Sequence, residues 1–247
     1  MNSLKSILRS RKKLRQIREK YKLFISIFHS PYRTIYQNLA ALGIEVILDV
    51  GANVGQFAVD MRRSGFKGQI HSFEPTKQTF IKLEKVAKKD PNWSVHNLGL
   101  GEYESESIIN VSQNDGLSSS ILEMNSIHQV NFPNSNTSYL ENIQLSTVDI
   151  QLKLLGLDPK ICLLKIDVQG FEWQVLQGAS GSLAKFPLLF IEASLVPLYR
   201  DEKDLITILN LLSRFNHRVI DIYRGVQTKS NKLLQIDLLT QLVDIES

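Results

Sequence analysis

Short apolar segments alternate with longer amphipathic ones along most of the chain. The apolar segments have the length and β-branched content of buried strands, and they lie at residues 46–50, 69–73, 93–98, 161–168 and 188–193. The segments with helical periodicity lie at residues 31–42, 56–64, 77–89, 171–177 and 201–215. Strands that alternate with helices predict a parallel sheet with right-handed crossovers.

Two regions depart from this alternation. Residues 102–147 are rich in Ser, Asn and Gln, with short strands at 108–111 and 143–145, and predict an insertion rather than a crossover helix. Strands at 217–223 and 233–239 flank a polar run and predict a terminal hairpin. We therefore expect an α/β, Rossmann-like fold with a seven-stranded, mostly parallel sheet, an antiparallel hairpin at its end and a polar insertion after the third strand.

Basic residues are concentrated near the start of the chain. We therefore expect a basic helical extension at residues 1–30, followed by one domain at residues 31–247. The net charge is +4, and one acid, Glu19, stands among the basic residues of positions 1–22, which are Lys5, Arg9, Arg11, Lys12, Lys13, Arg15, Arg18, Lys20 and Lys22. Such a segment is either a solvated helix or frayed terminus, or a contact for anionic lipid, glycan or nucleic acid. Aromatic residues are not interleaved with it, so nucleic acid is the less favoured partner.

The remaining composition is that of a folded domain, with 43% hydrophobic residues. The single cysteine, Cys162, lies in an apolar run and is expected to be buried, which excludes disulfides within the chain. Neither a small-residue cleavage site nor a bilayer-length apolar stretch is present. We expect a cytoplasmic protein, with contact to an anionic membrane surface through residues 1–22 as the alternative for that segment. The sequence leaves the oligomeric state open.

A glycine turn follows the strand at residues 46–50. The sequence VILDVGANVG places Asp49 near the carboxyl end of the strand, and Gly51 and Gly55 then allow a tight turn close to a ligand before the next helix. Glu74 ends the second strand, at the place where such folds hold a ribose diol. A strand, a glycine turn and a helix, with a second acid nearby, predict a nucleotide pocket.

The turn favours one cofactor over another. Dinucleotide sites use G-x-G-x-x-G, whereas the residues from Gly51 to Gln56 read GANVGQ and lack the glycine that approaches a pyrophosphate. A cofactor without phosphates needs only space and polar groups for an amino acid and a ribose. The turn therefore suits S-adenosylmethionine better than NAD.

Several motifs in order resemble the FkbM family of class I S-adenosylmethionine-dependent methyltransferases. They are VILDVGANVGQF at 46–57, HSFEP at 71–75, STVDI at 146–150, LLKIDVQGFEWQVLQGA at 163–179 and LLFIEAS at 188–194. The resemblance covers about residues 40 to 225 and implies the class I methyltransferase fold. Gln169 is a departure, because many members of the family carry glutamate there, although an amide still forms hydrogen bonds.

The resemblance also implies a cofactor site. It places the methionine end of S-adenosylmethionine at Asp49, Gly51, Asn53 and Gly55, and the ribose at Glu74. The adenine would lie along Leu100, Gly101 and Glu102. Glu102 is equally well explained as a surface acid of its loop.

Candidate catalytic groups lie where parallel strands end. Asp167 is our first candidate for a base or an acceptor-orienting carboxylate, with a helix-capping aspartate as the alternative. Glu192 ends the next strand and either assists or pairs with a lysine, and Lys165 is best explained as the cation of a structural salt bridge. His128 in the insertion is a candidate base if that segment covers the acceptor, and otherwise a solvated side chain.

The insertion also offers acceptor contacts. Ser118, Ser119 and Ser120 either bind a sugar or order their loop, and Gln169 is a candidate acceptor contact. Histidines are not paired at metal-ligand spacing, and we expect no required metal.

These observations favour an S-adenosylmethionine-dependent O-methyltransferase that acts on a hydroxyl of a glycan or a small metabolite. Two alternatives remain open from the sequence: an NAD-dependent oxidoreductase or epimerase, and a non-catalytic binding module recruited by its basic helix.

Overall fold

The computed structural model describes residues 31–113, 118–132, 135–228 and 230–243. The predicted basic extension at residues 1–30, with its proposed membrane contact through residues 1–22, lies outside the described residues. Within the described parts of the chain, no helix combines the length and the apolar character needed to cross a bilayer.

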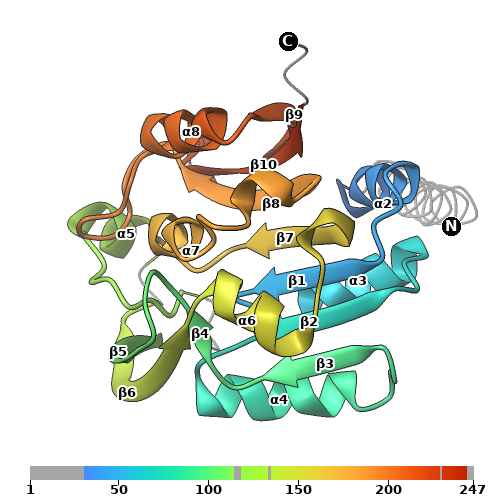
Figure 1. The fold of residues 1–247 in the computed structure, drawn as a ribbon. Coiled ribbons are helices and arrows are strands. Elements are labelled where there is room, and N and C mark those ends of the chain that lie inside the picture. Colours follow the sequence, from blue (N-terminus) through green and yellow to red (C-terminus); the bar gives the residue numbers. More distant parts are fainter. Residues whose placement is uncertain (1–30, 114–117, 133–134, 229, 244–247) are drawn as a thin grey trace, which may run out of the picture.

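The centre of the molecule is a seven-stranded sheet in the order β3-β2-β1-β7-β8-β10-β9. Its strands are β1 (Val46–Val50), β2 (Gln69–Phe73), β3 (Trp93–His96), β7 (Cys162–Ile166), β8 (Leu188–Ser194), β9 (His217–Arg224) and β10 (Gln235–Leu242). The first five run parallel, and β10 lies antiparallel between β8 and β9. The predicted parallel sheet with a terminal antiparallel hairpin is confirmed (Figure 1).

Helices cover both faces of this sheet. One face packs on α2 (Pro31–Ala41), α3 (Gln56–Ser64) and α4 (Lys77–Ala87). The other face packs on α6 (Val148–Leu155), α7 (Glu172–Gln177) and α8 (Leu205–Arg214). Short 3-10 helices at Pro159–Ile161 and Leu183–Lys185 precede β7 and β8. Because both faces are covered, β1 and β7 are buried along their whole length.

The polar insertion forms a second, smaller sheet. Strands β4 (Gly99–Leu100), β5 (Ser105–Ser112) and β6 (Thr137–Ser146) have the order β4-β6-β5, and a short helix, α5 (Ser126–Asn131), lies between β5 and β6 in the chain. Figure 1 shows this sheet beside the ends of β1 and β7, toward which the strand arrows point. The insertion therefore stands next to the edge of the sheet where ligands bind in such folds.

Two helices differ from the sequence prediction. We assigned no helix between residue 147 and β7, yet α6 lies there, begun by the Thr147 hydroxyl that accepts from the Ile150 N–H at 3.1 Å and ended by Gly156 at φ 66°. We also expected no helix in the insertion, where Asn125 caps α5 by accepting from the His128 N–H at 3.1 Å. Both helices are short, so hydrophobic periodicity alone was a weak signal. The capping residues Thr147 and Asn125 were the stronger indication of where each helix begins.

Some predicted boundaries were wrong for physical reasons. The third strand ends at His96 rather than at residue 98, because the chain then leaves the large sheet and Gly99 pairs with Leu145 in the small one. Helix α8 begins at Leu205 rather than at residue 201, since Asp201 has a positive φ of 63° and Asp204 caps the helix through the Thr207 N–H at 2.8 Å.

Candidate functional site

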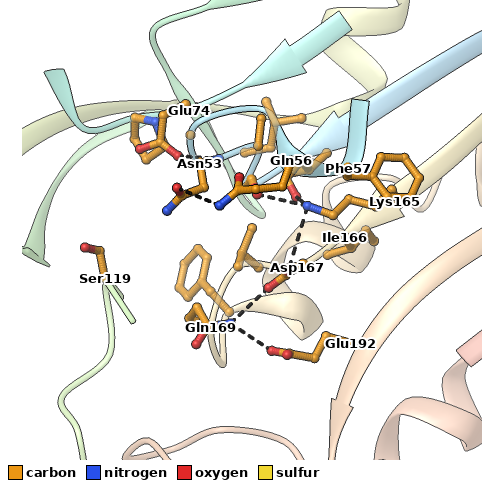
Figure 2. A pocket seen from close by; sticks show the side chains of 18 of the residues that line it. Asn53, Gln56, Phe57, Glu74, Ser119, Lys165, Ile166, Asp167, Gln169 and Glu192 are labelled. Carbon is orange, nitrogen blue, oxygen red and sulfur yellow. Dashed lines mark hydrogen bonds and ion pairs between the residues drawn. The ribbon is translucent and has the colours of Figure 1, made fainter. Parts of the chain in front are cut away.

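A cavity of about 310 Å³ opens at the carboxyl ends of the parallel strands, at the edge where the small sheet stands. Its walls come from the turns after β1 and β7, from the small sheet, and from α2, β8 and β10. In Figure 2, Glu74 and Asn53 lie at one end of the cavity, and Asp167, Gln169 and Glu192 lie at the other. A cavity of this size fits a small-molecule ligand.

The turn after β1 is held from beneath by β2. The N–H groups of Gly51 and Ala52 both donate to the Phe73 carbonyl, at 3.1 and 3.0 Å. Gly51 has φ 74°, and a Cβ there would lie 1.8 Å from the carbonyl oxygen of Asp167. We expected this glycine to make room for a ligand. In the structure it makes room for the turn after β7, which brings the two loops together.

Glu74 anchors the same turn. Its carboxylate accepts from the Asn53 N–H at 3.1 Å, from the Thr76 N–H at 2.9 Å and from the Thr76 hydroxyl at 2.5 Å. A carboxylate offers about four acceptor sites, so one remains for a ligand hydroxyl. Burial raises the pKa of Glu74 above its usual value, against these hydrogen bonds. Glu74 is thus fixed in place with acceptor capacity facing the cavity.

Asp49 and Lys165 form a buried ion pair behind the turn. The Lys165 ammonium lies 3.0 Å from Asp49, and it donates to the Gly51 carbonyl at 2.9 Å. The Ser72 hydroxyl donates to the other Asp49 oxygen at 2.9 Å. Burial alone would lower the pKa of Lys165, but the carboxylates of Asp49 and Asp167 outweigh it and raise that pKa to about 12. The expected structural salt bridge of Lys165 is confirmed.

The turn after β7 presents Asp167 to the cavity. Glu172 holds this turn by accepting from the N–H groups of Val168 and Gly170, at 3.0 and 3.2 Å. Phe171 is the N-cap residue of α7, and no side chain caps this helix, so Asp167 is not a helix cap. The Asp167 side chain is 42% exposed and lies 3.8 Å from the Lys165 ammonium. A carboxylate so placed is accessible to a ligand.

Gln169 joins the carboxylates at this end of the cavity. Its amide nitrogen donates to Asp167 at 2.9 Å and to Glu192 at 3.0 Å (Figure 2). Its amide oxygen accepts from the Tyr199 hydroxyl at 3.0 Å, which fixes the orientation of the amide. Glu192 also accepts from the Gln235 amide at 2.8 Å, and its expected alternative, a pair with lysine, is absent from the described contacts. Amide donors thus hold Asp167 and Glu192 at one place.

Part of the predicted site lines the cavity. Those residues are Gly51, Asn53, Glu74, Leu100, Ser119, Asp167, Gln169 and Glu192. The remaining predicted residues do not line it, namely Asp49, Gly55, Gly101, Glu102, Ser118, Ser120 and His128. Of these, Asp49 is fully buried beneath the turn, and Glu102 accepts a hydrogen bond from Tyr103 on the surface.

The insertion supports the site more than it lines it. The Ser120 hydroxyl donates to the Gln169 carbonyl at 2.6 Å, so this serine orders the turn after β7. His128 is 2% exposed, which corrects the expectation of a solvated loop histidine, and it contacts the Tyr199 hydroxyl at 3.3 Å. Burial lowers the pKa of His128 below its usual value. His128 therefore positions the residues that hold Gln169 rather than facing the cavity.

Sequence reasoning missed several residues that line the cavity. Asp237 comes from β10, Tyr32 from α2, and Phe57 and Phe190 from α3 and β8. The rings of Phe57 and Phe190 stack at 5.7 Å between centroids, and Tyr32 meets Phe57 edge-on at 5.8 Å. The sequence signal was weak, because aromatic residues in buried elements ordinarily belong to the core.

The FkbM methyltransferase domain matches residues 49–219, which is more than half of the chain. The chain belongs to the FkbM methyltransferase family. It is therefore an S-adenosylmethionine-dependent methyltransferase with a Rossmann-like class I fold, and this decides against the NAD-dependent and the non-catalytic alternatives. No curated protein matches the chain in sequence.

Two solved structures that resemble this FkbM methyltransferase do so at low sequence identity. An rRNA methylase from Streptococcus thermophilus has 11% identity and a TM-score of 0.48, over 85% of this chain and 95% of that one. Fibrillarin from Aeropyrum pernix, in complex with natively bound S-adenosyl-L-methionine, has 12% identity and a TM-score of 0.44, over 80% of this chain and 66% of that one. Likenesses this distant have no bearing on the acceptor.

The cavity fits the cofactor of the family. Glu74 keeps acceptor capacity for the ribose hydroxyls, while Asn53 and Gly51 border the cavity where the amino-acid end would bind. Leu100 and Leu145 give an apolar wall for the adenine. The bound cofactor supplies a methyl group on a positively charged sulfur. Among the described residues, no group of three or more His, Cys, Asp or Glu has the arrangement to hold a metal ion.

Proposed function

We propose that this FkbM methyltransferase transfers the methyl group to a hydroxyl of a glycan or another small metabolite. The observation that carries the proposal is the Asp167 carboxylate, which lines the cavity and is held by Gln169 at 2.9 Å. An alcohol must lose its proton when it is methylated, and a positioned base contributes about 10²- to 10⁴-fold to such a step.

The chemistry assigns a role to each residue at this end of the cavity. As the new oxygen–carbon bond forms, the acceptor proton passes to the Asp167 carboxylate, and the bonding electron pair stays with the cofactor sulfur. Gln169 orients Asp167 by donating to it, and Glu192 is held beside it through the same amide. Placement of the acceptor oxygen in line with the methyl group is the main contribution of the protein.

The residues around the acceptor end also support a hydroxylated substrate. Ser119 and Gln169 line the cavity there, and hydroxyl and amide groups form the hydrogen bonds that a sugar offers. The rings of Phe57, Phe190 and Tyr32 supply apolar surface for the carbon face of such a molecule. A mixture of polar groups and rings is suited to a glycan or a hydroxylated metabolite.

Transfer of a labelled methyl group from S-adenosylmethionine to a panel of hydroxylated sugars and metabolites tests the proposal. We expect a methyl ether as the product, and we expect Asp167→Asn to reduce turnover by about 10²-fold or more while the cofactor Kd stays within about twofold. Product found on nitrogen or carbon, or an Asp167→Asn variant with unchanged turnover, contradicts it.

A further inference from the structure

A third carboxylate faces the same end of the cavity from outside the part of the chain that the family domain covers. Asp237 lies on β10, beyond residue 219, and lines the cavity. In the antiparallel pairing of β8 with β10, Asp237 stands directly opposite Glu192. The cavity wall therefore brings together Asp167 from the turn after β7, Glu192 from β8 and Asp237 from β10.

Asp237 differs from the other two carboxylates in its partners. Glu192 accepts from two amides and Asp167 from one. Among the described residues, none donates a hydrogen bond to the Asp237 carboxylate, although the side chain is partly buried. A partly buried carboxylate without a donor is costly, and such groups mark sites where a ligand supplies the compensating charge or donor.

The balance of charge at the cavity is negative. Of the described residues that line it, four are acids, Glu74, Asp167, Glu192 and Asp237, and one is a cation, Lys165. Burial raises the pKa of Glu74 and, more strongly, that of Glu192, so these two carry less of the negative charge than the other acids. Lys165 is already matched by Asp49 at 3.0 Å and by the carbonyls of Val50 and Gly51. The excess negative charge is thus left for the ligand.

Aromatic rings in the cavity add to the attraction for a positively charged ligand. Tyr32, Phe57 and Phe190 line the same cavity as the carboxylates. Charges interact more strongly where the surrounding medium is less polar than water, and ring faces attract cations as well. A positively charged ligand gains from both effects, and a neutral ligand of the same shape gains from neither.

The cofactor changes charge during the reaction. Its sulfur carries a positive charge before transfer, and it becomes a neutral thioether when the methyl group leaves and the bonding electron pair stays on sulfur. We propose that Asp237, with Asp167, makes the cavity bind the charged sulfonium more tightly than the neutral thioether product. Transfer of the methyl group thereby weakens the hold on the spent cofactor and favours its release.

Calorimetric titration of the full chain with S-adenosylmethionine and with S-adenosylhomocysteine tests this proposal. We expect the sulfonium to bind about tenfold more tightly or better, since one favourable charge interaction of about 1.4 kcal/mol gives that ratio. Asp237→Asn keeps the shape and removes the charge, and it should reduce the ratio about threefold or more by weakening S-adenosylmethionine alone. Glu84→Gln, on the exposed face of α4, is the matched control and should leave the ratio unchanged.

Three results overturn the proposal. Equal affinity for the two ligands in the unchanged protein is one, and an Asp237→Asn variant that weakens both ligands equally is another, because that pattern means a purely structural role. Absence of binding by either ligand would contradict the cofactor assignment itself, and the proposal with it. The acceptor does not enter these titrations, so failure of the O-methylation proposal would leave them intact.

The pH dependence of this affinity ratio provides a second test. It uses the unchanged protein, so a folding defect in the variant cannot affect it. Asp237 is faced by Asp167, Glu192, Lys165 and Tyr32. Burial and the charge of Asp167 raise the pKa of Asp237 to about 6. The preference for the sulfonium should therefore increase between about pH 5.5 and about pH 8, as Asp237 loses its proton. A preference that is constant over this range contradicts the proposal.

Discussion

The ammonium group of Lys165 lies 3.0 Å from the carboxylate of Asp49, and their side chains are only 5% and 0% exposed. This pair stands directly behind the turn that borders the cavity, and Lys165 reaches through to the carbonyl of Gly51. The pair thus links the central strands β1 and β7 to the turn that borders the cavity. Its removal should affect the fold as well as the site.

Asp49→Asn leaves the buried Lys165 charge without its main partner. Breaking a buried ion pair from one side typically lowers the free energy of unfolding by about 3–5 kcal/mol. Urea unfolding followed by circular dichroism measures the loss. The exposed pair of Arg200 and Glu123, at 2.9 Å, provides the control, since Glu123→Gln should change stability by about 1 kcal/mol or less. Similar losses for both variants would contradict a structural role for the buried pair.

Gly51→Ala should separate the turns after β1 and β7. The added Cβ would lie 1.8 Å from the Asp167 carbonyl oxygen, so one of the two loops must move. We expect S-adenosylmethionine to bind about tenfold more weakly or worse, since displaced loops lose their contacts. Gly43→Ala is a matched control, because Gly43 also has a positive φ, 64°, but its Cβ would meet nothing within 4 Å. That variant should show only a small stability loss, with cofactor affinity retained.

Gln169→Leu tests the amide that holds two carboxylates together. Without its donor, the buried Glu192 carboxylate loses a stabilising hydrogen bond, so its pKa, which burial already raises, rises further. We expect the acidic limb of the pH profile of kcat to move toward higher pH, with kcat lowered about tenfold or more. Gln144→Leu, at an exposed amide that donates to Glu106, should leave the profile in place. A lower kcat with an unmoved profile would mean that Gln169 only supports the fold.

Asp237 should also make stability depend on pH. Burial raises its pKa to about 6 in the folded protein, so above the unfolded pKa of about 4 the unfolded chain loses this proton first. The stability that Asp237 contributes is therefore present below about pH 4 and lost as pH rises through about 6. The difference in unfolding free energy between the unchanged protein and Asp237→Asn should fall over this range and then stay level.

Asp90 provides the opposite case. At this carboxylate burial alone would raise the pKa, but the hydrogen bond from Arg62 at 2.6 Å, the Asn92 N–H and the charges of Arg62 and Lys67 together outweigh it and lower the pKa. Its stabilising contribution is present at neutral pH and is lost as pH falls through its lowered pKa. The corresponding difference for Asp90→Asn should thus increase with pH. If the difference in unfolding free energy changed with pH in the same direction for Asp90→Asn and Asp237→Asn, the opposite pKa shifts assigned to these two carboxylates would be contradicted.

The parallel strands, and the site residues at their carboxyl ends, could be predicted from local sequence signals. Apolar runs located β1, β2, β7 and β8, and acids next to the ends of these strands pointed to Glu74, Asp167 and Glu192. This works because the carboxyl ends of parallel strands meet at one edge of the sheet. Asp49 shows the limit of the approach, because an acid within a central strand can be enclosed on both sides, as its 0% exposure shows.

Asp237 could not be found in that way. Strand β10 runs antiparallel to β8, so its amino-terminal end, rather than its carboxyl end, reaches the cavity. The polar residues Gln235 and Asp237 at the start of the strand were the available signal. Tyr32 is a different case, since its place at the cavity depends on how α2 packs, which periodicity alone does not predict.

The central claim is that the cavity between Glu74 and Asp167 binds S-adenosylmethionine through Glu74. Calorimetric titration of S-adenosylmethionine, S-adenosylhomocysteine and NAD into the unchanged protein, Glu74→Ala and the surface control Glu84→Ala tests it most directly. We expect the first two ligands to bind and NAD not to bind. In Glu74→Ala alone, both should bind about tenfold more weakly or worse, because a lost hydrogen bond to a charged group is worth about 1.5–3 kcal/mol. Binding of NAD, or unchanged affinity in Glu74→Ala, would contradict it.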